Sequence, residues 1–295
     1  MKKESLNENL HGMSVSMLAF FVAAWATISV AAPSIWTGGK DTTWYAESAQ
    51  AFNLTTAEEL AGLAYLVNNG TTFQGKTITL GADIFLNDTT GAGKGTWSTS
   101  GKRMWTPIGT LSNPFKGEFD GLAGKKNRKI YGLYINDTTK NYVGLFGYTN
   151  GVKISNLDLL VGYVDGKNYA GSLVGNSFNG SIENIHSELN VVGKDTVGGI
   201  AGCGHEINDA SVIASIKGNN YVGGISGKDS SITNSTFEGY VKGTSYVGGV
   251  SGWVKIIKKS NSKGTIEGNA SHIGGVTGSA NIIDSVYHVN GIVQV

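Results

Sequence analysis

The stretch Tyr221-Val222-Gly223-Gly224-Ile225-Ser226-Gly227 decides the fold, because the chain repeats it with small changes. The closing glycines of successive copies recur at a nearly fixed interval of about 25 residues, which is typical of a solenoid whose repeats pack on their neighbours. The interval is slightly longer between the first copies than between the later ones. The five other copies occupy residues 142–147, 169–175, 196–202, 246–252 and 272–278.

Two further sequence features recur with nearly the same period. An isoleucine recurs at nearly the same interval, and a glycine follows the alternating strand pattern of each repeat. Each unit holds two or three short strand patterns and no helical period. The sequence therefore predicts an all-β fold, a right-handed parallel β-helix of about 25-residue turns with six repeats from about residue 142. The features are Ile154, Ile182, Ile207, Ile232, Ile257 and Ile282, and Gly166, Gly193, Gly218, Gly243 and Gly268.

The aligned repeats predict which side chains face the axis of the solenoid. The apolar residue before the glycines and the recurring isoleucine should each form an inward column. A polar residue two positions after each isoleucine should form a hydrogen-bonded ladder at a corner, which Lys259 interrupts. The first column is Val143, Ala170, Val197, Val222, Val247 and Ile273, and the ladder is Asn156, Asn184, Asp209, Asn234 and Asp284.

The first residues have the pattern of an export signal. Lys2 and Lys3 precede a short apolar run that ends in small residues near Ala31. Such a pattern is typical of a secretory signal peptide, which we place at residues 1–31. The alternative is an uncleaved membrane anchor. The signal predicts a secreted or cell-surface location, with no stable transmembrane segment after its removal.

Two further parts are expected after the signal. Residues 32–105 should form an N-terminal segment that caps one end of the solenoid, and residues 106–295 should form the parallel β-helix. The segment should contain a helix over about residues 56–68, because Thr55 and Glu58 form a capping box before apolar residues at helical spacing.

Composition excludes several classes of protein. The chain has 295 residues, of which 44 are glycine and only 3 are proline, so it lacks the composition of collagen. An apolar share of 40% and a net charge of +1 argue against disorder and against a general nucleic-acid binder. The single cysteine, Cys203, excludes an intrachain disulfide and a metal site built from cysteines.

The repeated phrase resembles the GLUG motif of bacterial secreted and surface proteins. The flank Trp105-Thr106-Pro107-Ile108-Gly109 and the segment 114–121 resemble the lead-in that those proteins carry, and the likeness covers roughly residues 50–290. The resemblance implies the β-helix architecture. GLUG repeats occur in adhesin-like proteins and beside the peptidase domain of immunoglobulin A-cleaving metalloproteases, so the resemblance leaves the function open.

The chain carries no complete catalytic or metal-binding motif. His205-Glu206-Ile207-Asn208-Asp209 begins like the zinc motif His-Glu-x-x-His, but an aspartate replaces the second histidine. Cys203 has His205 two residues away, and a small half-buried thiol is the simpler interpretation. The carboxylates of the repeats are scattered, although neighbouring turns can bring two of them together. We therefore expect no catalytic, cofactor or metal site, with a polysaccharide-active lyase or hydrolase as an alternative.

An aromatic column precedes the first inward column. If the valines face inward, strand alternation turns the preceding residues outward, where exposed rings can stack on sugars or anchor a partner. The alternative is mutual stacking that stabilises the rod. A basic cluster in the fifth repeat is either a solvated edge or a site for an acidic surface. The candidate binding strip is Tyr142, Tyr169, Tyr221, Tyr246 and His272, with Thr196 completing the row, and the basic cluster is Lys255, Lys258, Lys259 and Lys263.

These features favour a non-catalytic adhesion or binding module that recognises a glycan or a protein. The export signal, the repeat and the incomplete catalytic motifs support this hypothesis. A purely structural stalk or surface-assembly unit is an alternative, for which self-association through the open end near Val295 is expected. No nucleic-acid partner is expected.

Overall fold

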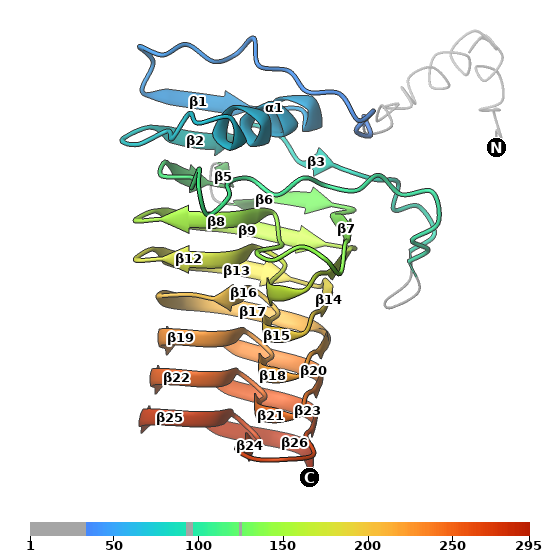
Figure 1. Ribbon diagram of the computed structural model, residues 1–295, viewed down its shortest axis with the longest axis vertical. Helices are drawn as coiled ribbons and strands as arrows, with labels where there is room; N and C mark the ends of the chain where they lie inside the picture. The colour runs from blue at the N-terminus through green and yellow to red at the C-terminus, as the bar shows by residue number, and fades with distance from the viewer. Residues whose placement is uncertain (1–33, 93–96, 124–125) are drawn as a thin grey trace, which may run out of the picture. The chain divides into compact units, whose positions relative to one another are not determined.

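The computed structural model of the protein describes residues 34–92, 97–123 and 126–295. The signal peptide expected at residues 1–31 lies outside this part of the chain. Residues 34–295 form one compact unit, a right-handed parallel β-helix of about nine turns of roughly 26 residues each (Figure 1). The fold class predicted from the repeat is therefore confirmed.

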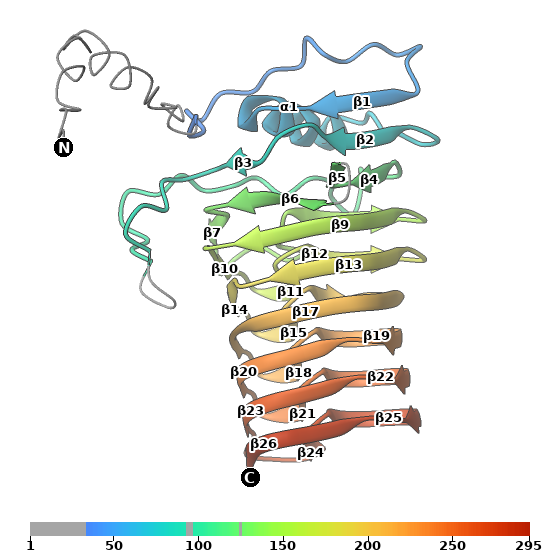
Figure 2. The same cartoon turned by 180° about the vertical axis from the view of Figure 1, so that it is seen from behind.

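Two sheets, of 21 and of five strands, build the walls of the solenoid (Figure 2). The five-stranded sheet contains β11 (Asn168–Ala170), β15 (Asp195–Gly198), β18 (Asn220–Gly223), β21 (Ser245–Gly248) and β24 (Ile273–Gly274). In the repeats the larger sheet contains β8 (Phe146–Asn150), β9 (Lys153–Leu160), β10 (Tyr163–Asp165), β12 (Val174–Phe178), β13 (Ser181–Ser187), β14 (Asn190–Val192), β16 (Ala201–Cys203), β17 (Glu206–Lys217), β19 (Ser226–Thr233), β20 (Thr236–Lys242), β22 (Ser251–Lys258), β23 (Asn261–Glu267), β25 (Thr277–Asp284) and β26 (Tyr287–Gln294).

The parallel stack begins upstream of residue 106, where the sequence analysis placed its start. β1 pairs in parallel with β2, β2 with β4, and β4 with β9 of the first repeat. The strands before the repeats therefore already belong to the solenoid. They are β1 (Ala51–Leu54), β2 (Thr77–Leu80), β3 (Ile84–Phe85), β4 (Glu118–Asp120), β5 (Leu122–Ala123), β6 (Lys126–Tyr131) and β7 (Tyr134–Asn136).

The expected helix is α1 (Ala57–Asn68). Its N-cap is Thr56, whose hydroxyl accepts from the Glu59 amide while the Glu59 carboxylate accepts from the Thr56 amide. The capping box therefore lies one residue later than predicted. The apolar face of α1 is buried, and the Asn68 side chain donates to the Pro107 carbonyl oxygen at 3.0 Å. These contacts fasten the helix to the first turns of the solenoid.

Both predicted apolar columns face the axis. The first five members of the valine column are at most 2% exposed, and the first five isoleucines are at most 1% exposed. The predicted isoleucine column is wrong at its last member. Ile257 pairs with Ile283, whereas Ile282 pairs with Ile256, and both residues of this last turn are exposed. The cause is one extra residue in the last repeat, which shifts the register.

The predicted polar ladder lies at a corner where the backbone is left-handed. Asn184 has a φ of 53°, and its side-chain nitrogen donates to Asn156 Oδ1 at 2.8 Å. Asn156 in turn has a φ of 60° and donates to Asp120 Oδ1 at 2.8 Å. Asparagine and aspartate tolerate positive φ better than most other residues, which explains why they recur at this corner.

The ladder is not continuous through the later turns. Asn234 donates to Asn208 rather than to a residue of its own column. Asp284 pairs with the residue before Lys259, so its predicted place in the ladder is wrong, and Ser285, with a φ of 54°, takes the corner. Lys259 sits at the corner with a φ of 47° and is exposed, as expected of the interruption.

We expect Asn184→Ala to lower the free energy of unfolding by about 1–2 kcal/mol, because alanine removes the ladder bonds at a left-handed position. Urea unfolding followed by circular dichroism measures this loss. Asp209→Ala is the matched control, since Asp209 has a φ of 56° at the same corner but makes no side-chain hydrogen bond to another described residue. Equal losses in the two variants would show that the ladder bonds contribute nothing.

Candidate functional site

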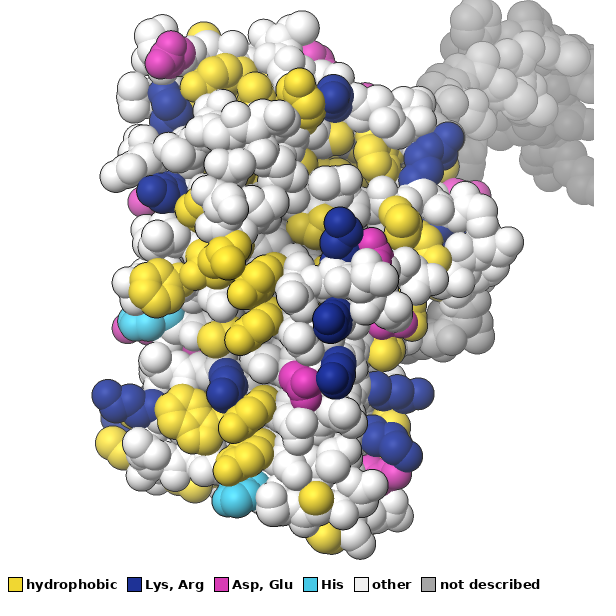
Figure 3. Space-filling view, viewed as in Figure 1, with side chains coloured by type: hydrophobic (Ala, Val, Ile, Leu, Met, Phe, Trp, Pro, Cys, Tyr) yellow, Lys and Arg dark blue, Asp and Glu magenta, His cyan; other side chains and the backbone are white. Residues whose placement is uncertain are grey.

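In the structure, the aromatic rings of the predicted binding strip stack on one another. All five strip residues have a positive φ and all but His272 are half-buried. Thr196, which is 6% exposed, divides the strip into two stacks. Figure 3 shows hydrophobic side chains in line on this face of the unit. The ring centroids are 4.9 Å apart for Tyr142 and Tyr169, 4.6 Å for Tyr221 and Tyr246, and 4.2 Å for Tyr246 and His272.

Stacked rings offer few free faces to a ligand. Tyr246 packs against one neighbour on each side, with interplanar angles of 17° and 9°. The Lys228 ammonium group lies 3.8 Å from the centroid of the Tyr221 ring, over its face. The contacts therefore favour mutual stacking that stabilises the rod over a strip that receives sugar rings.

The remaining sequence candidates lie around β16. Cys203 is half-buried, and burial raises the pKa of its thiol to about 11, so little thiolate is present at neutral pH. Asp209, the last residue of the incomplete zinc motif, is exposed. Within the described ranges, no group of three or more His, Cys, Asp or Glu side chains is placed to hold a metal ion.

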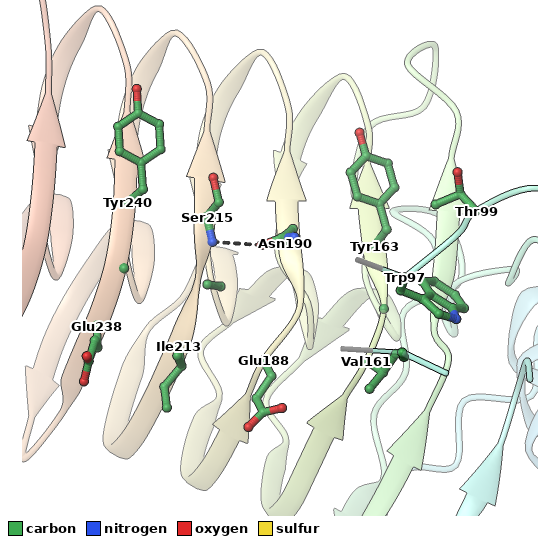
Figure 4. Close-up of a pocket in the computed structure, with 14 residues that line it drawn as sticks. Trp97, Thr99, Val161, Tyr163, Glu188, Asn190, Ile213, Ser215, Glu238 and Tyr240 are labelled. Atoms are coloured by element: carbon green, nitrogen blue, oxygen red, sulfur yellow. Dashed lines mark hydrogen bonds between the residues drawn. The ribbon is translucent and has the colours of Figure 1, made fainter. Parts of the chain in front are cut away.

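A groove that the sequence analysis did not predict crosses β10, β14, β17 and β20 (Figure 4). It encloses about 530 Å³. Two rows of side chains run across successive turns, and Trp97 and Thr99 lie at one end of them. The first row is Tyr163, Asn190, Ser215 and Tyr240, and the second row is Val161, Glu188, Ile213 and Glu238.

The parallel register keeps the first row in line. Tyr163 pairs with Asn190, and Ser215 pairs with Tyr240. The Ser215 amide donates to Asn190 Oδ1 at 2.9 Å, which joins the two middle residues. Because neighbouring turns lie about 4.8 Å apart, the two tyrosines are separated by about 14 Å along the axis. The row therefore places an aromatic ring at each end of a short polar stretch.

Small residues between the two rows make this surface concave. Ala214, Gly239 and Gly264 stack in register on successive turns. A Cβ on Gly239 would lie 2.0 Å from the Ala214 carbonyl oxygen, so the backbone leaves no room for a side chain there. The absent side chains allow a ligand to approach the backbone between the rows.

Carboxylates fix the two tyrosine hydroxyls of the groove. The Tyr163 hydroxyl donates to Asp165 Oδ2 at 3.1 Å, and the Tyr240 hydroxyl donates to Glu267. Burial, with a smaller effect from the Asp165 charge, raises the pKa of Tyr163 to about 12. Both rings are therefore held in place, and Tyr163 stays a neutral phenol at physiological pH.

The sequence analysis missed the groove because its first row is not aromatic in every repeat. The signal was present, since each member of the row is the third residue before a repeat glycine such as Gly166. In the predicted strip, four of the six copies carry tyrosine, which made that column the more visible one. Aligning the positions before the glycines would have placed Tyr163 and Tyr240 on one face.

Comparison with known proteins gives little further guidance. No protein-family profile matches the chain, and no solved structure matches it. Over 90 residues, 29% of this chain, the sequence is 37% identical to a protein of Evansella cellulosilytica that is provisionally named a Gly-rich membrane protein. The matched stretch is 10% of that relative's length. In the part of this chain that the structure describes, no helix is long and apolar enough to cross a membrane.

Proposed function

We propose that the protein is a non-catalytic, exported β-helix protein that binds a glycan in the groove between Tyr163 and Tyr240. The composition of the groove carries this proposal. It has aromatic rings about 14 Å apart along the axis, with an amide and a hydroxyl between them. Sugars present apolar ring faces and hydroxyl edges, so aromatic faces beside amide and hydroxyl groups are complementary to them.

The groove supports binding better than the predicted strip does. The aromatic neighbour of Tyr163 is Tyr134, and the centroids of the two rings are 6.5 Å apart with a tilt of 30° between their planes. Tyr240 has no aromatic partner among the described residues. The faces of the groove tyrosines are therefore less covered than the faces of the stacked rings in the strip.

The proposal also includes export, which the signal pattern and the GLUG-like repeat support. The signal pattern at residues 1–31 and the GLUG-like phrase support a bacterial secreted or cell-surface protein, where glycans are abundant partners. The similarity to a relative that is named a membrane protein agrees with a place at the cell envelope.

The test is a comparison of two double variants on a broad panel of polysaccharides. Tyr163→Ala with Tyr240→Ala should weaken binding at least tenfold, because the two ring contacts are lost. Tyr221→Ala with Tyr246→Ala should change the affinity by less than about twofold, since those rings pack mainly on each other. Affinity electrophoresis and pull-down with insoluble glycans measure the binding, and thermal unfolding checks that both variants fold.

Two results would contradict the proposal. One is a wild-type protein that binds no polysaccharide on the panel, and the other is a loss of binding in the strip variant alone. Release of reducing sugar or of unsaturated product would instead favour the polysaccharide-active alternative.

A further inference from the structure

Five exposed lysines form a ridge near the ends of β7, β10, β14, β17 and β20. The Lys167 amide donates to the Lys140 carbonyl oxygen at 2.7 Å, and the Lys194 amide donates to the Lys167 carbonyl oxygen at 2.5 Å. These three lysines therefore occupy equivalent positions of consecutive turns. Asn219 continues this column, because its amide donates to the Lys194 carbonyl oxygen. Lys217 and Lys242 pair with each other on the next two turns and form a second column two residues earlier in the chain, since Lys217 pairs with Val192. The lysine ridge is thus Lys140, Lys167, Lys194, Lys217 and Lys242.

Four of the five ridge lysines make no ion pair with another described residue, and the fifth, Lys242, pairs with Glu267 at 2.5 Å. Carboxylates do lie near the ridge, since Asp137, Asp165 and Asp195 come from the same corner, but none of them is within ion-pair distance of a ridge lysine among the described residues. Within each of the two columns, like charges about 5 Å apart repel one another, so lysines without an ion pair attract anions.

The ridge runs beside the groove. Lys217 lies two residues beyond Ser215 on β17, and Lys242 lies two residues beyond Tyr240 on β20. Successive outward residues of a strand are about 7 Å apart, so these two lysines lie at about that distance from the first row of the groove. Lys167 and Lys194 lie farther from it, four residues beyond Tyr163 and Asn190. A shallow depression lies along the ridge and is lined by Lys167, Lys194, Lys217 and Lys242 together with Asp165. Figure 3 shows Lys and Arg side chains aligned along the axis.

We propose that the glycan is acidic, a polysaccharide whose carboxylate or sulfate groups pair with the lysine ridge while its rings lie against Tyr163 and Tyr240. This inference rests on the proposed function, because it names the substrate class of the same groove. An uncharged row with a tyrosine at each end, flanked by a ridge of ammonium groups, matches a polymer that carries rings and anionic groups side by side.

Other polyanions fit these observations less well. The whole chain has a net charge of only +1, whereas proteins that bind nucleic acids are usually basic overall. A membrane surface would meet the lysines but would leave the rings of the groove without a partner. The presence of tyrosine rings beside lysines therefore favours an acidic polysaccharide over a nucleic acid or a membrane.

The experiment compares carboxymethyl cellulose with hydroxyethyl cellulose, and dextran sulfate with dextran, on the full chain. Each pair keeps the sugar backbone and changes the charge. The ridge variant is Lys167→Gln with Lys194→Gln and Lys217→Gln. The control variant is Lys255→Gln with Lys258→Gln and Lys259→Gln, which removes the same charge from exposed lysines outside the ridge. Polyglutamate serves as a polyanion without sugar rings.

We expect at least one acidic polymer to bind at least tenfold more tightly than its neutral partner. The ridge variant should lose at least tenfold in that affinity and the control less than about twofold, with strong weakening between about 50 and about 500 mM salt. Neutral binding that is indifferent to the ridge variant would overturn the acidic preference while leaving the proposed function intact. Equally tight binding of polyglutamate would also overturn it. Absence of binding to every polysaccharide would refute the proposed function and this inference together.

Discussion

Replacing Gly224 with alanine is expected to remove about 4 kcal/mol or more of folding stability, a large share of the total for an ordinary domain. Gly224 is buried, and an added Cβ would lie 2.1 Å from the Gly249 carbonyl oxygen of the next turn. The same Cβ would lie 2.2 Å from the Phe237 ring, which is 1% exposed. Backbone on one side and a packed ring on the other leave no direction in which the methyl group can be accommodated.

Equilibrium urea unfolding and soluble yield measure the effect of this substitution. Gly39→Ala is the control, because a Cβ on Gly39 would meet only ordinary contacts, the nearest at 3.6 Å. The control should unfold within about 0.5 kcal/mol of the wild type. A Gly224→Ala protein that unfolds within about 1 kcal/mol of the wild type would show that the turns can separate, contrary to a closely packed stack.

The position of Gly224 also shows where sequence reasoning succeeds and where it stops. Paired glycines such as Gly223 and Gly224 are typical of places where turns bend or backbones pack closely, and the closeness of Gly249 to Gly224 is an example of such packing. The partner across the interior was not predictable. Phe237 lies about half a turn further along the chain, and its contact with Gly224 depends on how the chain crosses the turn, for which the sequence has no local signal.

A single inserted residue accounts for the two wrong positions near the end of the chain. Gly252 and Gly278 are one residue further apart than Gly227 and Gly252, whereas the isoleucine alignment assumed an unchanged interval. Ile282 and Asp284 were therefore each placed one residue too early. Since strand side chains alternate between faces, a shift of one residue changes an inward position into an outward one.

The sequence predicts that exposed aromatic rings form the candidate site, but it does not predict which face of the solenoid carries it. An exposed aromatic column was expected, and the structure contains aromatic rings on two faces. The regular column stacks on itself, because identical rings at equivalent positions lie about one turn spacing apart, as Tyr221 and Tyr246 do at 4.6 Å. Tyr163 has Tyr134 on the turn before it, 6.5 Å away and tilted by 30°, and Asn190 on the turn after it. Tyr240 lies between Ser215 and Thr265, so the faces of both groove tyrosines are less covered than those of the regular column.

Asp229→Asn is expected to stabilise the protein by several kcal/mol at mildly alkaline pH and to remove most of the pH dependence of its stability. Asp229 pairs with Val254 in an inward position and is 3% exposed. Neither of its carboxyl oxygens has a hydrogen-bond partner among the described residues. The carboxyl group occupies the space that the absent side chain of Gly204 leaves, since a Cβ there would lie 2.4 Å from Asp229 Oδ2.

The direction of the effect follows from the proton that the folded state holds. Burial raises the pKa of Asp229 to about 8, although the nearby Ser226 hydroxyl and the amides of Ser230 and Ser231 lower it in part. In the unfolded chain the same carboxyl titrates with a pKa near 3.9, roughly the value of an exposed aspartate. This contribution to stability is therefore complete below about pH 4 and is lost as the pH rises to about 8. At about 1.4 kcal/mol for each pKa unit, the loss is on the order of several kcal/mol.

Urea unfolding at about pH 4.5 and about pH 8.5 tests this expectation. The wild type should lose stability between the two values, while Asp229→Asn, which keeps the shape of the protonated carboxyl without titrating, should change little. Asp209→Asn, at an exposed position, should follow the wild type. A wild type that is equally stable at both pH values, or an Asp229→Asn protein that loses as much as the wild type, would show that the carboxyl is not held protonated. In that case the wall of the solenoid must open at Gly204 far enough for water to reach the carboxylate, because an unpaired charge does not persist in a dry interior.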